Sequence, residues 1–476
     1  MRPDPGLDLA DPVLRSAGAL ADRLGLEAYV VGGYVRDRLL GQACADLDIL
    51  VLGDGVRFAR ALAPAIGGMA VVVHEKFRTA QIPLGDRKVE CVGARRENYL
   101  PESRNPQVEE GTLEEDLRRR DFTVNAMAVP LGGERKGRLV DLFGGREDCG
   151  RRLLRTPLDP ETTFGEDPLR MMRLVRFAAQ LGFDADGAAL RAVRAMKERI
   201  SIVSQERITE EFLKILRSSA PSRGLGLLQD TGLLRLVFPE AAAMAGVDQR
   251  RDHHHKDVFL HTCTVVDNLA RSSDKLWLRF AGLVHDIAKP RTKAFREGTG
   301  WTFHGHEELG ARMLKPLFRR MRLPLDPLPY VEKLVRLHLR PMALVDEGVT
   351  DSAVRRLVFE AGNEIDDLLA LCRADITSKN PRLVERYLRN YDGVVRKITE
   401  VEEKDRLRNW QPPVKGDEIM ALCGLAPGRE VGVLKGAIEE AILEGRIPNE
   451  HDAAVAYLLS VREELLEGFR RNAEQK

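Results

Sequence analysis

Short apolar runs alternate with amphipathic stretches over the first 150 residues of the chain. Tyr29–Val31 precedes two glycines, Ile49–Leu52 follows an aspartate, and Val71–Val73 precedes a polar turn. Runs of this length with such boundaries are typical of strands, and the apolar stripe from Val56 to Ala65 is typical of a helix. The pattern predicts a small domain in which a mixed sheet packs against helices.

Apolar positions follow the helical period from Asp167 onward. Leu169, Met172 and Phe177 share one helical face, and further helical stretches continue to the C-terminal end. Segment 98–115 has two prolines and many charges, so we predict a mobile loop there. The predicted fold class is α+β, a head with a mixed sheet followed by helical domains. The predicted domains are a head over 1–150, a neck over 151–240, a third domain over 241–395 and a tail over 396–476.

Composition and charge narrow the class of protein. The 476 residues carry 74 basic and 73 acidic side chains, which excludes a uniformly basic nucleic-acid coat but leaves room for local basic patches. Aromatic residues make up only 5%, which argues against bases held mainly on stacking platforms. Six scattered cysteines, an acidic N-terminus and no long apolar run predict a cytoplasmic protein that does not span a membrane.

A glycine pair follows the first predicted strand. Gly32 and Gly33, with Arg36 shortly after them, precede a predicted helix. Glycines there let backbone N–H groups approach a phosphate, and a helix N-terminus favours an anion. When the pair is considered alone, an ordinary turn is the more common explanation.

Three carboxylates lie on or beside predicted strands. Asp46 and Asp48 are two residues apart, so a strand places both on one face, and Glu90 lies in another strand-like run. Hard oxygen ligands of this kind bind the pair of metal ions used in phosphoryl transfer. A solvated edge strand is the alternative for the aspartate pair alone.

Cationic and polar residues follow in two further segments. Arg119–Ala126 places cations beside polar groups suited to a triphosphate and a ribose. Glu166–Arg170 opens a helix, where Asp167 before a proline also fits an ordinary N-cap. The candidate nucleotide-binding residues are Gly32, Gly33, Arg36, Arg119, Arg120, Asp121, Asn125, Asp167, Arg170, Arg173 and Arg176.

Taken together, these segments resemble the motifs of the class II tRNA nucleotidyltransferases, which comprise the CCA-adding enzymes and bacterial poly(A) polymerases. The matching segments are, in order, Gly32–Asp37, Asp46–Asp48, Arg119–Ala126, Asp141–Asp148, Glu166–Arg170 with Arg173, Arg176 and Phe177, and Glu206–Leu216. The resemblance covers roughly residues 28–217. It implies a polymerase-beta-like head with Asp46, Asp48 and Glu90 as catalytic residues and Mg²⁺ on the two aspartates. It also implies template-independent addition of CCA to the tRNA 3′ end from CTP and ATP, with release of pyrophosphate.

The resemblance further implies that protein side chains select the base. Asp167 and Arg170 lie three apart on one helical face. A carboxylate acceptor beside a guanidinium donor matches the amino group and ring nitrogen of cytosine and of adenine. Uracil and guanine present a carbonyl and a ring N–H instead, and two buried mismatches cost several kcal/mol.

A second set of candidate metal ligands, made of histidines and aspartates, is spread over the later helical region. Imidazoles and carboxylates that converge from several helices can bind a divalent metal, although any one of these histidines alone is more often structural. Their order resembles the HD superfamily of metal-dependent phosphohydrolases. The resemblance implies His261, His285, Asp286 and Asp375 as core ligands, with His306 and His338 at positions used by binuclear members. The histidines of the tract 253–255 are not all predicted as ligands, and His304 is not predicted as one.

Alternative interpretations remain for the role of the C-terminal region and for the reaction that the protein catalyses. Segment 415–432 resembles the tail of HD-bearing CCA-adding enzymes, where a glycine turn near Arg429 and Lys435 can face tRNA phosphates or simply pack two helices. The alternative functions are a poly(A) polymerase and an enzyme that adds only CC or only A. A different class of alternative is an HD phosphohydrolase whose head only docks tRNA.

Overall fold

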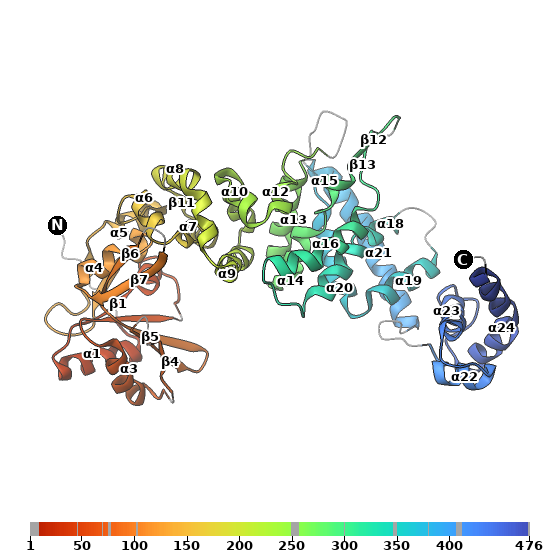
Figure 1. The fold of residues 1–476 in the computed structure, drawn as a ribbon, viewed down its shortest axis with the longest axis horizontal. Helices are drawn as coiled ribbons and strands as arrows, with labels where there is room; N and C mark the ends of the chain where they lie inside the picture. Colours follow the sequence, from red (N-terminus) through yellow and green to blue (C-terminus); the bar gives the residue numbers. More distant parts are fainter. Residues whose placement is uncertain are drawn as a thin grey trace. The chain divides into compact units, whose positions relative to one another are not determined.

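The computed structural model describes residues 9–44, 46–68, 70–74, 78–100, 103–248, 257–298, 300–345, 350–378, 380–405 and 412–474. The chain forms two compact units, Met1–Ala242 and Ala243–Lys476. The first combines a sheet with helices and the second is mainly helical, so the predicted α+β class is confirmed (Figure 1). The four predicted domain boundaries stay predictions. Among the described helices, none is both long and apolar enough to cross a membrane.

A seven-stranded mixed sheet forms the base of the first unit. Its strand order is β3-β4-β5-β2-β1-β8-β9, and only the neighbours β2 and β5 run parallel. Central strands β1 and β2 are buried on almost every position, which explains their continuous apolar runs. The strands are β1 Ala28–Val31, β2 Leu47–Val51, β3 Val72–His74, β4 Thr79–Leu84, β5 Arg87–Gly93, β8 Met127–Pro130 and β9 Val140–Asp141.

Helices cover this sheet and continue beyond it as the neck. The parallel pair β10 Leu153–Leu154 and β11 Asp184–Ala185 lies among the neck helices. The helices near the sheet are α1 Pro12–Leu24, α2 Gly33–Leu39, α3 Gly55–Leu62, η1 Ala63–Ile66, α4 Leu113–Arg118, η3 Thr123–Asn125 and α5 Gly145–Arg151. The neck helices are α6 Pro160–Glu166, α7 Leu169–Leu181, α8 Gly187–Met196, η4 Lys197–Ile202, α9 Gln205–Leu216, α10 Pro221–Thr231, α11 Leu233–Val237 and α12 Pro239–Ala242.

The loop predicted over 98–115 is wrong. Strands β6 Arg95–Leu100 and β7 Ser103–Glu110 form an antiparallel two-stranded ribbon. Helix α4 follows, beginning with a capping box in which Thr112 and Glu115 exchange hydrogen bonds. In a ribbon of two strands, each strand has one edge that is not hydrogen-bonded to a further strand, and a proline is tolerated there. Charged residues are also common on strands at the edge of a sheet.

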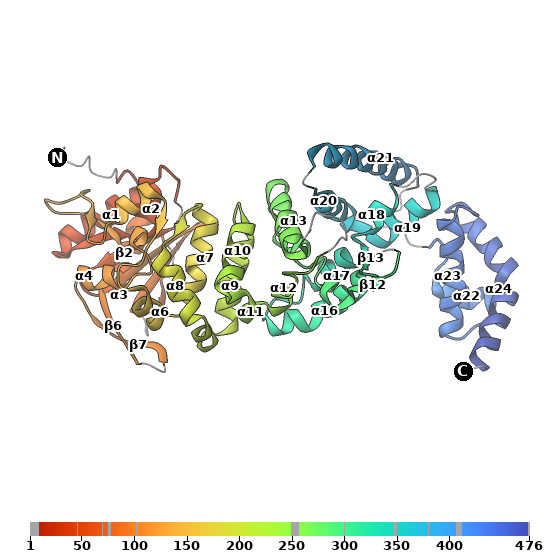
Figure 2. The same cartoon turned by 90° about the horizontal axis from the view of Figure 1, so that it is seen from above.

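The second unit contains two groups of helices and a small ribbon. Helices α22, α23 and α24 lie together around a core that includes Ile419, Leu434 and Leu458 (Figure 2). The helices before them are α13 Val258–Ser272, α14 Leu276–Val284, α15 Lys289–Thr292, α16 His306–Arg320, α17 Leu328–Leu337, α18 Arg340–Ala343, α19 Asp351–Ala361, η5 Gly362–Glu364, α20 Ile365–Asp375 and α21 Pro381–Asp405. The remaining elements are β12 Ala294–Arg296, β13 Gly300–Thr302, α22 Gly416–Cys423, α23 Arg429–Leu443 and α24 His451–Glu474.

Candidate active site and metal centre

The turn between β1 and α2 brings the backbone against a carboxylate. Gly32 has a φ of +72°, and a Cβ at this position would lie 3.0 Å from Arg120 Nη1 and 3.4 Å from Asp48 Oδ2. A positive φ together with this close approach favours glycine. The glycine therefore lets the start of α2 lie directly beside Asp48 and Arg120.

Asp48 and Glu90 are neighbours across the parallel strands β2 and β5. The register pairs these two residues directly, and Asp46 lies just before β2 with Lys88 Nζ 3.9 Å from its carboxylate. Burial, together with the charges of Glu90 and Asp46, raises the pKa of Asp48 to about 6, although the Arg120 charge opposes them. Carboxylates on adjacent strands can supply oxygen ligands to a divalent cation. Among the described residues, however, these three do not form a group whose ligand atoms all lie within 4.8 Å of one another, so joint binding of an ion requires their side chains to move closer.

Arg119 and Arg120 are held by a residue that sequence analysis missed. Asp116 on α4 is fully buried and accepts hydrogen bonds from Arg119 Nε at 3.0 Å and from Arg120 Nη2 at 3.1 Å. Although burial opposes ionisation, these two guanidinium groups keep the pKa of Asp116 below its usual value. The sequence did contain a sign of this contact. Asp116 lies three and four residues before Arg119 and Arg120, and residues at these spacings share a helical face.

Four predicted nucleotide-binding residues form one hydrogen-bonded network. Arg36 Nη1 donates to Asn125 Oδ1 at 2.6 Å, and Asn125 Nδ2 donates to Asp121 Oδ1 at 3.0 Å. Arg173 Nε on α7 donates to Asp121 Oδ2 at 2.8 Å. Against the effect of burial, Arg173 and Asn125 lower the pKa of Asp121 to about 2. The network ties α2, η3 and α7 together beside the carboxylates.

Arginines also surround one aromatic ring on α7. The guanidinium carbon of Arg176 lies 3.9 Å from the centre of the Phe177 ring, and those of Arg36 and Arg173 lie 5.4 Å from it. Arg176 Nε donates to Glu211 on α9 at 2.6 Å. Phe177 and Glu211 therefore orient the arginine-rich face of α7.

The structure does not pair Asp167 with Arg170. Asp167 Oδ1 accepts from the backbone N–H of Leu169 at 3.1 Å, as an N-cap does, and Arg207 Nη2 lies 3.7 Å from Asp167 Oδ2. Arg170 Nη1 donates to Glu166 at 3.0 Å. Sequence analysis included Arg207 only as part of a matching segment and gave it no role.

The segment 141–148 has a visible structural role. Asp141 accepts hydrogen bonds from the backbone N–H groups of Gly145 and Arg146 at the start of α5. Asp148 accepts from Thr123 Oγ1 at 2.6 Å and from Arg155 Nε at 3.1 Å. These contacts fasten α5 to the turn η3 that carries Asn125.

The ends of five helices in the second unit bring six candidate ligands together. We call these residues the His/Asp cluster. They are His261 on α13, His285 and Asp286 directly after α14, His306 at the start of α16, His338 directly after α17 and Asp375 at the end of α20.

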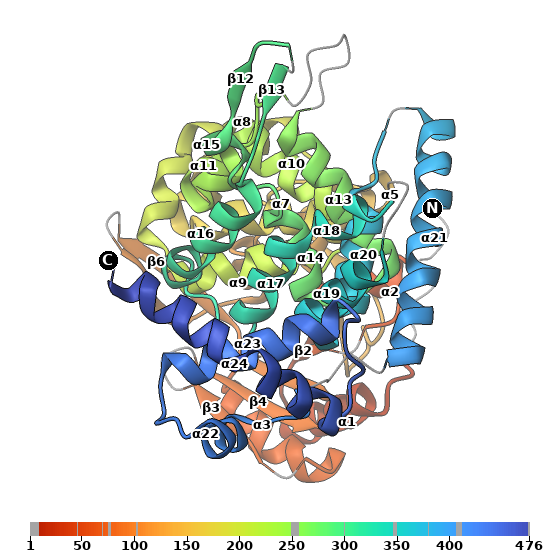
Figure 3. The ribbon, with the colours of Figure 1, turned by 90° about the vertical axis from the view of Figure 1, so that its right-hand side faces the viewer.

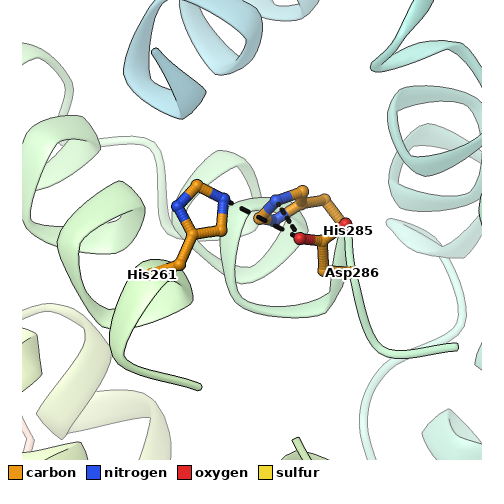
Figure 4. Close-up of side chains that lie close together, drawn as sticks. All are labelled: His261, His285 and Asp286. Carbon is orange, nitrogen blue, oxygen red and sulfur yellow. Dashed lines mark ion pairs between the residues drawn. The ribbon is translucent and has the colours of Figure 1, made fainter. Parts of the chain in front are cut away.

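The Nε2 atoms of the four imidazoles point at the carboxylates of this cluster. His261 Nε2 lies 2.7 Å from Asp375 Oδ1, and Figure 4 shows the same imidazole beside His285 and Asp286. His285 Nε2 lies 3.2 Å from Asp286 Oδ2. On the other side of Asp286, Oδ1 lies 3.4 Å from His306 Nε2 and 3.9 Å from His338 Nε2.

Hydrogen bonds on the far side of the rings fix this orientation. In three imidazoles Nδ1 donates to the backbone carbonyl three residues earlier, at 2.7–2.8 Å, and in the fourth it bonds a hydroxyl. The pairs are His285 with Gly282, His306 with Phe303, His338 with Val335 and His261 with Thr377 Oγ1. Because a carbonyl only accepts, Nδ1 carries the hydrogen in those three rings and Nε2 is left for a ligand, as in metal-bound histidines.

Donor chemistry and burial in the cluster fit divalent metal ions. The ligand atoms form two triads, His261–His285–Asp286 and Asp286–His306–His338, each with its atoms within 4.8 Å of one another. Among the described residues, His285 Nε2 and Asp286 Oδ1 are buried atoms that lack a hydrogen-bond partner of good geometry. Imidazole nitrogen with carboxylate oxygen is a common donor set for divalent transition metals.

Electrostatics in the cluster are dominated by its carboxylates. Although burial opposes it, Asp286 and Asp375 raise the pKa of His285 to about 10. His285 and Lys289 hold the pKa of Asp286 well below its usual value, again against burial. Burial, together with the His285 charge, lowers the pKa of His338 to about 4. The buried carboxylate of Asp286 and the half-buried one of Asp375 therefore attract positive charge, which a metal ion also supplies.

Two partners of the cluster were missed by sequence analysis. Lys289 Nζ lies 2.7 Å from Asp286 Oδ2, and its spacing of three residues was the available signal. Thr377, which bonds His261, had no signal because the contact joins distant segments. His304, not predicted as a ligand, is exposed, and tract 253–255 lies outside the described residues.

Comparison with known proteins identifies the family. The sequence matches the poly A polymerase head domain over residues 28–155, the probable RNA and SrmB-binding site of polymerase A over 182–244 and the HD domain over 252–378. It is 34% identical to the A-adding tRNA nucleotidyltransferase of Deinococcus radiodurans, with 90% of this chain and 94% of that protein covered. The chain belongs to the tRNA nucleotidyltransferase family.

Other members of this tRNA nucleotidyltransferase family are similar over comparable lengths. The CC-adding tRNA nucleotidyltransferase of Thermus thermophilus is 34% identical, with 91% of this chain and 93% of that protein covered. The CTP complex of the Bacillus stearothermophilus CCA-adding enzyme has a TM-score of 0.68 at 24% identity, covering 96% of this chain and all of that one. The predicted family, fold and enzyme class of this nucleotidyltransferase are confirmed, and the residue roles stay predictions.

Proposed function

We propose that this nucleotidyltransferase builds the CCA end of tRNA from CTP and ATP. In each step the tRNA 3′ hydroxyl oxygen bonds to the α-phosphorus of the nucleotide, and the bond to pyrophosphate breaks. The observation that carries the proposal is the alignment of Asp48 with Glu90 beside Gly32 and Arg120. In this proposal Mg²⁺ would be held by Asp46 and Asp48, with Glu90 beside them. The ion would activate the 3′ hydroxyl and neutralise the charge of the leaving pyrophosphate.

The other residues of the head and neck bind and orient the nucleotide. Arg119 and Arg120, fixed by Asp116 next to Asp48, are placed to bind the triphosphate. Asp167 and Arg170 read the base edge in this proposal. Because the Arg170 guanidinium donates to Glu166 and to the backbone carbonyls of Thr163 and Arg119, reading the base requires it to exchange part of these hydrogen bonds for one with the base. Cytosine and adenine form hydrogen bonds with both side chains, which compensates for the hydrogen bonding that Arg170 gives up. Uracil and guanine leave buried polar groups unpaired.

The experiment that tests this proposal reads product lengths. tRNAs that end before the first C, after C and after CC are each incubated with CTP, ATP, UTP or GTP singly. We expect CTP to extend the first two substrates and ATP to extend only the third. Products that stop after CC, or extension of the third substrate alone, would instead indicate a CC-adding or A-adding enzyme. A long oligo(A) product would indicate a poly(A) polymerase.

A second activity, metal-dependent phosphoester hydrolysis, is favoured by the geometry of the His/Asp cluster. Four imidazole nitrogens face the buried carboxylate of Asp286 and the half-buried one of Asp375, and no covalent nucleophile is required, because metal-bound sites of this type activate water. The proposed substrate is a 2′,3′-cyclic phosphate or a terminal phosphate on a damaged tRNA end. The water oxygen bonds to phosphorus and the P–O3′ bond breaks, with the proton of water going to O3′. A cyclic phosphate then remains as a 2′-phosphate, a terminal 3′-phosphate leaves as inorganic phosphate, and the freed 3′ hydroxyl is the nucleophile that the head needs.

Metal analysis and hydrolysis assays test this second activity. We expect the purified protein to retain a divalent metal, or to hydrolyse a 2′,3′-cyclic nucleotide when Mg²⁺, Mn²⁺ or Ni²⁺ is added. Protein that neither binds metal nor hydrolyses any phosphoester would leave the alternative that the second unit is only a helical platform for tRNA.

A further inference from the structure

A small ribbon beside the His/Asp cluster carries an exposed aromatic pair. We call strands β12 and β13 the aromatic ribbon; it projects beyond the helices of its unit (Figures 1 and 3). Phe295 and Trp301 are 50% and 39% exposed, and among the described residues they are the only aromatic side chains that are strongly exposed. They are direct cross-strand partners, with ring centres 5.2 Å apart.

Both ends of the aromatic ribbon are joined to the candidate metal ligands. Before β12, Lys289 pairs with Asp286 and places its Nζ 5.6 Å from the centre of the Phe303 ring. After β13, the carbonyl of Phe303 accepts the Nδ1 hydrogen bond of His306. Trp301 lies two residues before Phe303, about 7 Å along an extended strand. The ribbon therefore extends directly from the cluster.

The charge of this region is complementary to a nucleic acid. Residues 289–296 include Lys289, Arg291, Lys293 and Arg296 and no acidic residue, and Glu297 follows. Lys293 Nζ lies 4.3 Å from the centre of the Trp301 ring. Exposed aromatic rings interleaved with cations are the arrangement that stacks bases and attracts phosphates in single-strand binding.

We propose that the aromatic ribbon stacks the terminal base of a single-stranded RNA 3′ end and so presents its phosphate to the His/Asp cluster. This inference rests on the proposed phosphoesterase activity of that cluster. Base stacking gives a reason for the exposure of two aromatic side chains on this ribbon. The same pair also packs across the two strands, and the test must separate that contribution to folding from base stacking.

Photo-cross-linking tests the contact without requiring catalysis. The probe is a short single-stranded RNA whose 3′ nucleotide is 4-thiouridine with a 2′,3′-cyclic phosphate, and cross-links are mapped in tryptic peptides of the full chain. We expect a cross-link in peptide 297–312, which contains Trp301, and its loss in Trp301→Ile. Absence of this cross-link from the wild-type protein, or its persistence in the variant, overturns the proposal. A cross-link supports it even if no phosphoester is hydrolysed, so the two proposals fail separately.

Kinetics provide the second readout and the controls. Isoleucine is apolar and, like tryptophan, favours strands, but it has no ring face, so the unfolding temperature of Trp301→Ile should be unchanged. We expect this variant to raise KM for adenosine 2′,3′-cyclic phosphate about tenfold, with kcat and the hydrolysis of a base-free cyclic phosphate unchanged. The matched control is Tyr387→Ile on α21, which also removes a ring beside an arginine. Equal effects of the two variants, or equal loss on both substrates, overturn the proposal.

Discussion

At the scale of single residues, Asp48 carries a charge that its surroundings disfavour. Burial and the neighbouring carboxylates Glu90 and Asp46 raise its pKa to about 6, although Arg120 opposes them. Groups arranged for function commonly reduce stability in this way. Replacing the carboxylate by its neutral isostere should therefore change activity and stability in opposite directions.

The first prediction concerns activity. Asp48→Asn should lower nucleotide addition by more than about 100-fold, because it removes a proposed metal ligand, while tRNA affinity changes little because phosphate contacts come from cations. Single-turnover extension and filter binding measure the two quantities. The control is Asp54→Asn, which keeps an acceptor for the N-cap of α3. Near-normal turnover of Asp48→Asn would contradict the assignment.

The second prediction concerns stability against pH. Because the folded-state pKa of Asp48 lies above its ordinary value of 3.8, its unfavourable charge is absent below about pH 4 and fully present above pH 6. In EDTA, Asp48→Asn should therefore raise the unfolding temperature at pH 7.5 by at least about 2 °C, and the gain should vanish near pH 4. Thermal unfolding at both pH values measures it, and an equal shift at both would refute the argument.

The third prediction concerns base choice. Asp167→Ala should reduce the preference for CTP over UTP at least about tenfold, because it removes the acceptor that disfavours a uracil carbonyl. It also removes an N-cap hydrogen bond from α7, which costs about 1 kcal/mol. Asp186→Ala removes the cap of α8 in the same way and serves as the control. Unchanged discrimination in competition assays would refute selection by Asp167.

At the scale of elements, the ribbon of β6 and β7 lies directly before the helix that fixes Arg119 and Arg120. Its second strand ends at Glu110, and α4 begins at Leu113. The same site has to accept cytosine and then the larger adenine, and an element beside it is placed to adjust the fit.

The fourth prediction shortens this ribbon. Replacing residues 98–107 by Asn-Gly joins the register pair Glu97 and Val108 through a two-residue turn. We expect addition of the two cytidines to continue, and addition of the final adenosine to fall about tenfold or more. Extension assays on tRNAs ending before C and after CC measure both steps. Equal loss of the two steps would contradict a role in the last addition.

Sequence patterns predicted the local elements well and the long-range partners poorly. The buried strands β1 and β2 have continuous apolar runs that identify them as strands. The alignment of Asp48 on β2 with Glu90 on β5 is a pairing between two segments that the sequence identified only as separate strands. The ribbon of β6 and β7 was missed because its stability comes from pairing and not from apolar periodicity. Contacts such as Arg207 with Asp167 join distant segments, and no pattern within one segment encodes them.

At the scale of the whole molecule, the two candidate sites belong to different compact units. The carboxylates of the head lie in the first unit and the His/Asp cluster lies in the second. Every hydrogen bond and ion pair described above joins residues of the same unit. Loss of one site should therefore leave the chemistry of the other intact.

The fifth prediction tests this independence. His285→Ala combined with Asp286→Ala should abolish metal-dependent phosphoesterase activity and leave nucleotide addition to an intact tRNA within about twofold, because the head keeps all of its ligands. A tRNA that ends in a 2′,3′-cyclic phosphate should become a substrate for addition only with the wild-type protein. Loss of addition to intact tRNA in a variant that stays folded would show that the sites are coupled.

Both triads of the His/Asp cluster depend on one shared carboxylate. Asp286 belongs to both triads, with Oδ2 facing His261 and His285 and Oδ1 facing His306 and His338. A substitution at any one histidine damages one triad and spares the other, whereas a substitution at Asp286 removes both together. The cluster thus has redundancy among its imidazoles and none at its centre, so graded losses are expected from the histidines and an all-or-none loss from Asp286.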